Sequence, residues 1–274
     1  MTPRPAAEPF PARSGPGGGP VRRVVSLVPS LTEAVAVSAP GLLVGATDWC
    51  SHPAGLDVVR VGGTKNPDVP AITALAPDLV IANEEENRAP DLAALRAAGL
   101  PVMVTEVRSL PQSFTELARV LVEGCGLPRP GWLDAARAAW LDVTPYAPRL
   151  RAVVPIWRRP WMTLGRDTFA GDLLAALGVD HVHAGDAERY PRADLARLPA
   201  ADLVILPDEP YRFTAEDGPE AFPGLPAALV SGRHLTWYGP SLVEAPEVIG
   251  RALRAAVHRP GPARRARGGP DPRV

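Results

Sequence analysis

The chain has 274 residues, of which 46% are hydrophobic and 22% are charged, and its formal net charge is −1. This length predicts one large or two modest domains with apolar cores. The near-neutral charge excludes nucleic acid and an anionic membrane surface as the main partner. The sequence also lacks a run of about 18 apolar residues, which a membrane-spanning helix would need.

The N-terminal sequence carries neither the apolar stretch of a secretory signal nor a cysteine for a lipid anchor, so as it stands it predicts a cytoplasmic protein. The two cysteines, Cys50 and Cys125, fit no disulfide framework, and we expect free thiols. Residues 1–20 are rich in proline and glycine and are expected to be a disordered lead-in. Residues 260–274 have a similar composition with added arginine, and are expected to be a disordered basic tail.

Short apolar runs alternate with helical patterns through residues 21–127, which predicts an N-terminal α/β lobe with a parallel sheet. Its strands are expected at 24–28, 43–46, 79–82 and 102–105. Ser30 and Glu33 follow the first strand in the spacing of a capping box, which indicates the start of a helix.

An amphipathic helix is predicted at 130–144, where Trp132, Ala136 and Trp140 fall near one face. Prolines on both sides isolate it, so we interpret residues 128–149 as the connector between two lobes. Residues 150–259 then repeat the α/β pattern, with strands at 152–156 and 203–206 and a helix at 169–177.

Polar residues follow the apolar strand of each half. The strand at 79–82 leads into Asn83-Glu84-Glu85-Glu86-Asn87, and the strand at 203–206 leads into Asp208 and Glu209. Ligands of open α/β sheets bind beyond the carboxyl ends of the strands. We therefore expect two lobes that face one ligand cleft.

Motifs along residues 24–257 then match a known family in order: VVSLVPSLTE, TDWCSHP, VGGTKNP, ALAPDLVIANEEEN, WMTLGRDTFAGDLLAALGV, DLVILPDEPYRF and SGRHLTWYGPSL. The chain resembles the helical-backbone, or class III, substrate-binding proteins of ABC importers. The resemblance is closest to the vitamin B12-binding branch and its relatives, the helical backbone metal receptors. It implies an α/β fold of two Rossmann-like lobes with central parallel sheets, joined by a single backbone helix, with the ligand cleft between them.

The resemblance implies a non-catalytic, monomeric binding protein that needs no cofactor and holds a metal-containing small molecule, with cobalamin or a related corrinoid first among the ligands. Its aromatic and polar ligand-binding residues are expected to come from both lobes. They are Trp49, His52, Thr64, Lys65, Asn83, Glu85, Asn87, Trp157, Trp161, Glu209, Tyr211, His234, Trp237 and Tyr238. The single backbone helix also predicts little closure of the lobes on binding.

His52 and His234 stand where B12-binding relatives place aromatic residues. Two histidines that face each other could ligate a metal together with Glu84 and Glu86, or they could be hydrogen-bonding walls beside a corrin. An alternative is a cytoplasmic receptor for a metal ion, a ferric siderophore or heme without a permease. Its candidate ligands are Cys50, His52, Glu84, Glu85, Glu86, Asp208, Glu209 and His234.

Permease docking in this family uses an acidic residue on each lobe. Asp194 matches the position in the second lobe, but Pro70 replaces the acid in the first, so the resemblance supports binding better than transport through an ABC permease. We find no nucleophile elbow, Walker loop, dinucleotide fingerprint or HExxH motif in the sequence. Gly62-Gly63-Thr64-Lys65 lacks the spacing of a phosphate loop. The sequence therefore predicts a protein that is not an enzyme.

Overall fold

Two parallel sheets organise residues 20–258, which the computed structural model describes. The first sheet has the strand order β3-β2-β1-β6-β7. Its strands are β1 (Val24–Ser26), β2 (Leu43–Ala46), β3 (Val59–Arg60), β6 (Leu79–Asn83) and β7 (Val102–Thr105), and all neighbouring pairs are parallel. Disorder was expected for residues 1–20 and 260–274. Apart from residue 20, these residues lie outside the described range.

Alternate residues of these strands face two helical layers, as a parallel sheet buried on both faces requires. Val24, Leu79 and Ile81 belong to the cluster that includes α1 (Pro29–Ser38) and α4 (Leu110–Ala118). Val25, Val80 and Ala82 belong to the cluster that includes α2 (Val69–Ala74) and α3 (Ala89–Ala97). A π-helical turn (Arg119–Gly124) extends α4, and the hairpin β4 (Gly62–Gly63) and β5 (Asn66–Pro67) precedes α2.

The second sheet has the order β11-β8-β12-β13, and its strands are also parallel. They are β8 (Leu150–Val153), β11 (Val179–His181), β12 (Leu203–Pro207) and β13 (Ala227–Val230). An antiparallel hairpin of β9 (Pro155–Arg158) and β10 (Trp161–Thr163) follows β8. The helices of this lobe are α6 (Phe169–Ala176), α7 (Gly232–Thr236) and α8 (Ala245–Val257), with short 3-10 turns at Leu195–Arg197, Pro219–Ala221 and Pro240–Val243.

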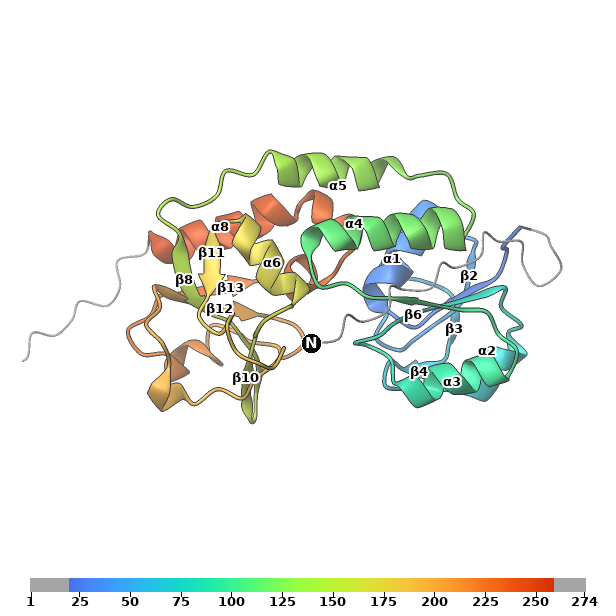
Figure 1. Cartoon of the computed structure of the whole chain (residues 1–274), viewed down its shortest axis with the longest axis horizontal. Coiled ribbons are helices and arrows are strands. Elements are labelled where there is room, and N and C mark those ends of the chain that lie inside the picture. Colours follow the sequence, from blue (N-terminus) through green and yellow to red (C-terminus); the bar gives the residue numbers. More distant parts are fainter. Residues whose placement is uncertain (1–19, 259–274) are drawn as a thin grey trace, which may run out of the picture.

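Helix α5 (Gly131–Leu141) lies across both lobes, above the two sheets in the view of Figure 1. The indole of Trp132 donates a hydrogen bond of 3.0 Å to Ser38 Oγ in the first lobe. The indole of Trp140 donates one of 3.0 Å to the carbonyl oxygen of Leu242 in the second. The two contacts fix α5 to each lobe separately.

The two lobes also share one hydrophobic core. A single cluster of buried side chains contains Ile81 of the first sheet, Leu133 of α5, Ile205 of the second sheet and Ile249 of α8. Pulling the lobes apart would expose such side chains, at about 1.5–3 kcal/mol for each large apolar one. This shared core is a stronger restraint on lobe movement than the connecting helix alone.

The capping box expected at Ser30 is wrong. Helix α1 begins at Pro29, its N-cap position is Val28, and no side chain caps it. Proline at the first helical position has no N–H that needs a cap. Ser30 and Glu33 are instead buried, and Glu33 forms an ion pair with Arg233 of the second lobe. The capping pattern thus marks residues that hold the lobes together.

No helix between residues 20 and 258 is long and apolar enough to cross a bilayer.

Candidate ligand-binding site

The loop Asn83–Asn87 is shaped by the two asparagines at its ends. Asn83 Oδ1 accepts a hydrogen bond of 2.9 Å from the backbone N–H of Glu85, and Asn83 Nδ2 donates one of 3.1 Å to the Thr105 carbonyl. Asn87 Oδ1 accepts from the Asn83 N–H at 2.9 Å, and Asn87 Nδ2 donates to the Thr64 carbonyl at 2.9 Å. Both side chains are buried. Although both were expected to bind the ligand, their polar atoms are used within the first lobe.

Glu84 and Glu85 of this loop reach the second lobe. Glu85 Oε2 pairs with Arg189 Nη2 at 2.8 Å, and its Oε1 accepts a hydrogen bond from the Tyr190 hydroxyl. Glu84 pairs with Arg108 at 2.8 Å within its own lobe, and its Oε1 also lies 4.0 Å from Arg189 Nη1 of the second lobe. Lys65 donates to the Glu85 carbonyl. We use the term interlobe seam for the contact surface between the two lobes. It runs along the loop Asn83–Asn87 and around His52.

Glu86 is a partly buried carboxylate in the seam. Among the described residues its side chain has neither a hydrogen-bond donor nor a salt-bridge partner. Burial raises the pKa of Glu86; the neighbouring Glu85 raises it further, and Lys65 opposes the shift. The pKa of Tyr238 in the second lobe is raised mainly by burial and then by the charges of Glu86 and Glu85. The charged form of Glu86 is therefore poorly compensated by its surroundings.

Glu209, which follows β12, forms the second polar group of the seam. Its Oε2 accepts a hydrogen bond of 2.9 Å from the indole of Trp237. The Trp237 ring meets the ring of His52 from the first lobe edge-on, at a centroid distance of 5.3 Å. Burial raises the pKa of Glu209 against the opposing effect of the Trp237 hydrogen bond. Three predicted site residues from two lobes thus lie together.

Tyr238 is buried between the lobes. Interaction with the side chains of Ser30 and Thr105 in the first lobe opposes the burial that raises the pKa of its hydroxyl. Its ring meets Phe169 edge-on at a centroid distance of 5.7 Å. The next residue, Gly239, passes so close to the first lobe that a Cβ there would lie 3.0 Å from the Ser30 carbonyl oxygen. Tyr238 was expected to bind the ligand, and in this structure it packs the lobes against each other.

The expected metal ligands are not gathered at one point. His234 Nδ1 contacts Ser231 Oγ at 2.8 Å, and its Nε2 contacts Glu244 at 2.9 Å, so both ring nitrogens are engaged. Cys50 is buried against the hydroxyls of Thr32 and Thr47. Across residues 20–258, no group of three or more His, Cys, Asp and Glu side chains could hold a metal ion. The set His52, His234, Glu84 and Glu86 therefore forms no metal centre in this structure.

The tryptophans expected at the site divide into two kinds. Trp49 of the first lobe is 68% exposed and Trp157 of the second is 42% exposed. Trp157 meets Tyr211 edge-on at 5.7 Å. Trp161 stacks on Phe213 with centroids 5.9 Å apart and meets Phe222 edge-on, so it belongs to the small core of its lobe. The exposed indoles of Trp49 and Trp157 have faces that a ligand could contact, whereas Trp161 is already packed inside its lobe.

Two further predicted positions lie near the surface. Thr64 is partly buried and Lys65 is exposed at the turn of the β4–β5 hairpin. Asp194, the expected docking acid, is exposed, and its Oδ1 accepts a hydrogen bond of 3.0 Å from the Ala196 N–H. In the first lobe Pro70 is exposed inside α2, and the nearby Asp68 caps that helix.

Comparison with known proteins adds to this geometry. No family model matches the chain. It is 26% identical over 202 residues to the vitamin B12-binding protein of Vibrio cholerae, which covers 71% of this chain and 70% of that protein. The crystal structure of periplasmic vitamin B12 binding protein BtuF of Vibrio cholerae has a TM-score of 0.67 and 18% identity, over 88% of this chain and 99% of that one. The chain has the class III binding-protein fold.

Heme-binding proteins share this fold. Periplasmic heme-binding protein RhuT from Roseiflexus has a TM-score of 0.71 and 20% identity, over 86% of this chain and 99% of that one. The resemblance stated from the sequence motifs is confirmed at the level of the fold. The BtuF and RhuT structures are described as periplasmic, so the cytoplasmic location expected from the sequence gains no support from them.

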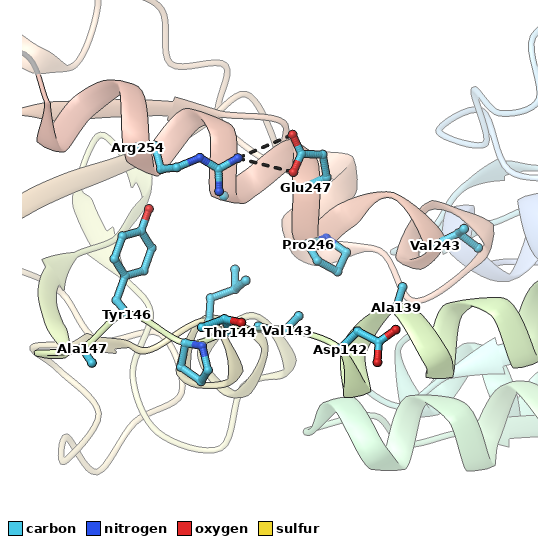
Figure 2. A pocket seen from close by; sticks show the side chains of 13 residues that line it. Ala139, Asp142, Val143, Thr144, Tyr146, Ala147, Val243, Pro246, Glu247 and Arg254 are labelled. Atoms are coloured by element: carbon cyan, nitrogen blue, oxygen red, sulfur yellow. Dashed lines mark hydrogen bonds and ion pairs between the residues drawn. The ribbon is translucent and has the colours of Figure 1, made fainter.

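A separate pocket of about 610 Å³ is lined by residues outside the seam. It is formed by the end of α5, the segment 142–147 and α8; Figure 2 shows the Glu247–Arg254 ion pair of α8 on one wall and Asp142 on another. The lining residues include none of the predicted ligand-binding residues. This pocket was not foreseen from the sequence.

Arg189, Tyr190 and Arg233 are the seam residues that sequence reasoning missed. Arg233 lies in the matched motif SGRHLTWYGPSL, and its neighbour His234 was singled out, so the motif offered a signal. Arg189 and Tyr190 lie in a stretch with no motif or apolar period, and their partner Glu85 is about a hundred positions away in the chain. No local pattern could have paired them.

Proposed function

We propose that this chain is the substrate-binding component of an ABC-type importer, and that it holds a metal-containing ligand, cobalamin or a related corrinoid, between its two lobes. It binds without chemical turnover. The class III fold and the 26% identity to a vitamin B12-binding protein support this proposal. One structural observation carries it further, which is the arrangement of exposed indoles on both sides of the seam.

Trp49 lies three positions before His52, and Trp157 contacts Tyr211, which is two positions after Glu209. Because His52 and Glu209 both contact Trp237, each side of this contact has an exposed indole nearby. A corrin ring is large, flat and partly apolar, and indole faces can cover it while a few polar groups fix its orientation. Water-exposed indoles in free protein would be buried by such a ligand.

An alternative function uses the same site for a different ligand and without a permease. The protein would then be a receptor for a metal ion, a ferric siderophore or heme that is not coupled to a permease. The heme-binding structures of the same fold favour this alternative for heme, and Pro70 in place of the first docking acid favours the absence of a permease.

The proposal is tested by equilibrium titration of the full chain with cyanocobalamin, followed by tryptophan fluorescence. We expect saturable one-to-one binding, and at least a tenfold weaker affinity in the double variant Trp49→Ala, Trp157→Ala, because each buried aromatic contact contributes on the order of 1 kcal/mol or more. The matched control is Leu141→Ala. Leu141 is 83% exposed at the end of α5, so its loss tests whether any exposed apolar side chain has the same effect. Absence of binding, or equal affinity in the double variant, contradicts the proposal.

A further inference from the structure

Within residues 20–258, the seam contains one carboxylate on each side that forms no salt bridge. Glu86 belongs to the first lobe and Glu209 to the second. Glu209 accepts a hydrogen bond from Trp237, whose ring meets His52 of the first lobe. Glu86 directly follows Glu85, which contacts Arg189 and Tyr190 of the second lobe. Both carboxylates therefore belong to loops that make contacts between the two lobes.

The cations of the seam are engaged elsewhere. Arg189 pairs with Glu85, Arg108 pairs with Glu84 and Glu106, and Arg233 pairs with Glu33 and Glu244. Lys65 donates to a backbone carbonyl.

The nearby cations do not offset the effect of burial on the pKa of either carboxylate, and the nearby acids add to that effect. At Glu86, burial and the charge of Glu85 outweigh Lys65. At Glu209, burial and Asp208 outweigh the Trp237 hydrogen bond, His52 and Arg233. A ligand that enters the seam thus meets one carboxyl group from each lobe that forms no salt bridge within residues 20–258.

We propose that Glu86 and Glu209 determine the charge class of the ligand, so that the site accepts neutral or cationic metal complexes rich in hydrogen-bond donors and rejects those with carboxylates of their own. This inference rests on the proposed function, since it assumes that the ligand binds at the seam. A primary amide can donate its N–H groups to a carboxylate. A ligand carboxylate at the same place would bring together two like charges away from water, a repulsive element of the kind that produces specificity.

Corrinoids and heme differ in this respect. Cobalamin carries primary amides around its ring, whereas heme carries two propionates. Siderophore complexes with a net negative charge would be rejected in the same way as heme. Charge selection by Glu86 and Glu209 therefore favours the corrinoid among the ligands that this fold could hold.

The test uses three probes on the full chain: cyanocobalamin, aquocobinamide as a cationic corrinoid, and hemin. Each is titrated into the unmodified protein, the double variant Glu86→Gln, Glu209→Gln, and the control Glu123→Gln. Glu123 is an exposed carboxylate in the π-helical turn Arg119–Gly124 that follows α4. Glutamine keeps the size and an acceptor oxygen but removes the charge.

We expect the unmodified protein to bind both corrinoids at least tenfold more tightly than hemin. The ratio of hemin affinity to cyanocobalamin affinity should rise at least tenfold in the double variant and stay unchanged in Glu123→Gln. Hemin binding as tight as corrinoid binding, or an unchanged ratio in the double variant, overturns charge selection while leaving the binding function intact. Failure of all three probes to bind overturns the proposed function, and this inference with it.

Discussion

At the scale of a single residue, the partly buried carboxylate of Glu86 lowers the free energy of unfolding of the protein. A carboxylate is poorly solvated when it is partly buried without a cation, so its charged form is disfavoured in the folded protein. Functional sites often keep such groups at the expense of stability. The asparagines at the two ends of the same loop are different, because the polar side-chain atoms of Asn83 and Asn87 form hydrogen bonds within the first lobe.

Glu86→Gln is therefore expected to stabilise the free protein at neutral pH. Because the pKa of Glu86 is raised in the folded state, folding holds a proton that the unfolded chain would release, and stability falls as the pH rises through this raised pKa. The variant should gain about 2–4 °C in Tm at pH 7.5 if the cost is on the order of 1 kcal/mol. The gain should vanish near pH 4, below the usual glutamate pKa. Thermal unfolding at both pH values measures it, and an equal gain at both would contradict the explanation.

The central strands were predictable from the sequence, because a strand of a parallel sheet is buried on both faces and therefore has a continuous apolar sequence. The strands expected at 79–82 and 203–206 are observed as Leu79–Asn83 and Leu203–Pro207. The helix expected at 130–144 is observed at Gly131–Leu141. Pairings across the lobes were not predictable, since Glu85 with Tyr190 and Glu33 with Arg233 depend on how distant elements are brought together.

The candidate site was predictable only in part for the same reason. Motif positions led to His52, Glu209 and Trp237, which lie in contact. The motifs could not show that Trp161 stacks on Phe213 inside its lobe. Whether an aromatic side chain of a strand faces a ligand or a neighbouring strand depends on tertiary packing, which its sequence position does not reveal.

The segment 186–192 contacts the first lobe through Arg189 and Tyr190, which both meet Glu85, and Arg189 also lies 4.0 Å from Glu84. We expect the segment to become more mobile when one of these contacts is removed. Tyr190→Phe removes the hydroxyl that donates to Glu85. We expect faster hydrogen exchange of the backbone amides of 186–192, with no change in α8. The matched control is Tyr146→Phe, because the Tyr146 hydroxyl is buried without a hydrogen-bond partner among the described residues. Equal exchange in Tyr190→Phe and the unmodified protein would show that the contact does not hold this segment.

At the scale of the whole molecule, the shared core determines how far the lobes can move. Buried residues from both sheets, α5 and α8 form one cluster, and Tyr238 and Leu242 of the second lobe pack against the first lobe and α5. Hinge closure usually needs flexible connections between independently packed lobes. This molecule is built instead to bind with small adjustments of its seam, in which Trp49 and Trp157 supply the exposed surface.

A crystal structure of the full chain with cyanocobalamin tests this account most directly. The account predicts the corrinoid between the lobes, in contact with Trp49 and Trp157 and with its amides toward Glu86 and Glu209, and only a small rotation of one lobe relative to the other. A corrinoid bound in the 610 Å³ pocket behind α5, or a large opening of the lobes around it, would contradict the account.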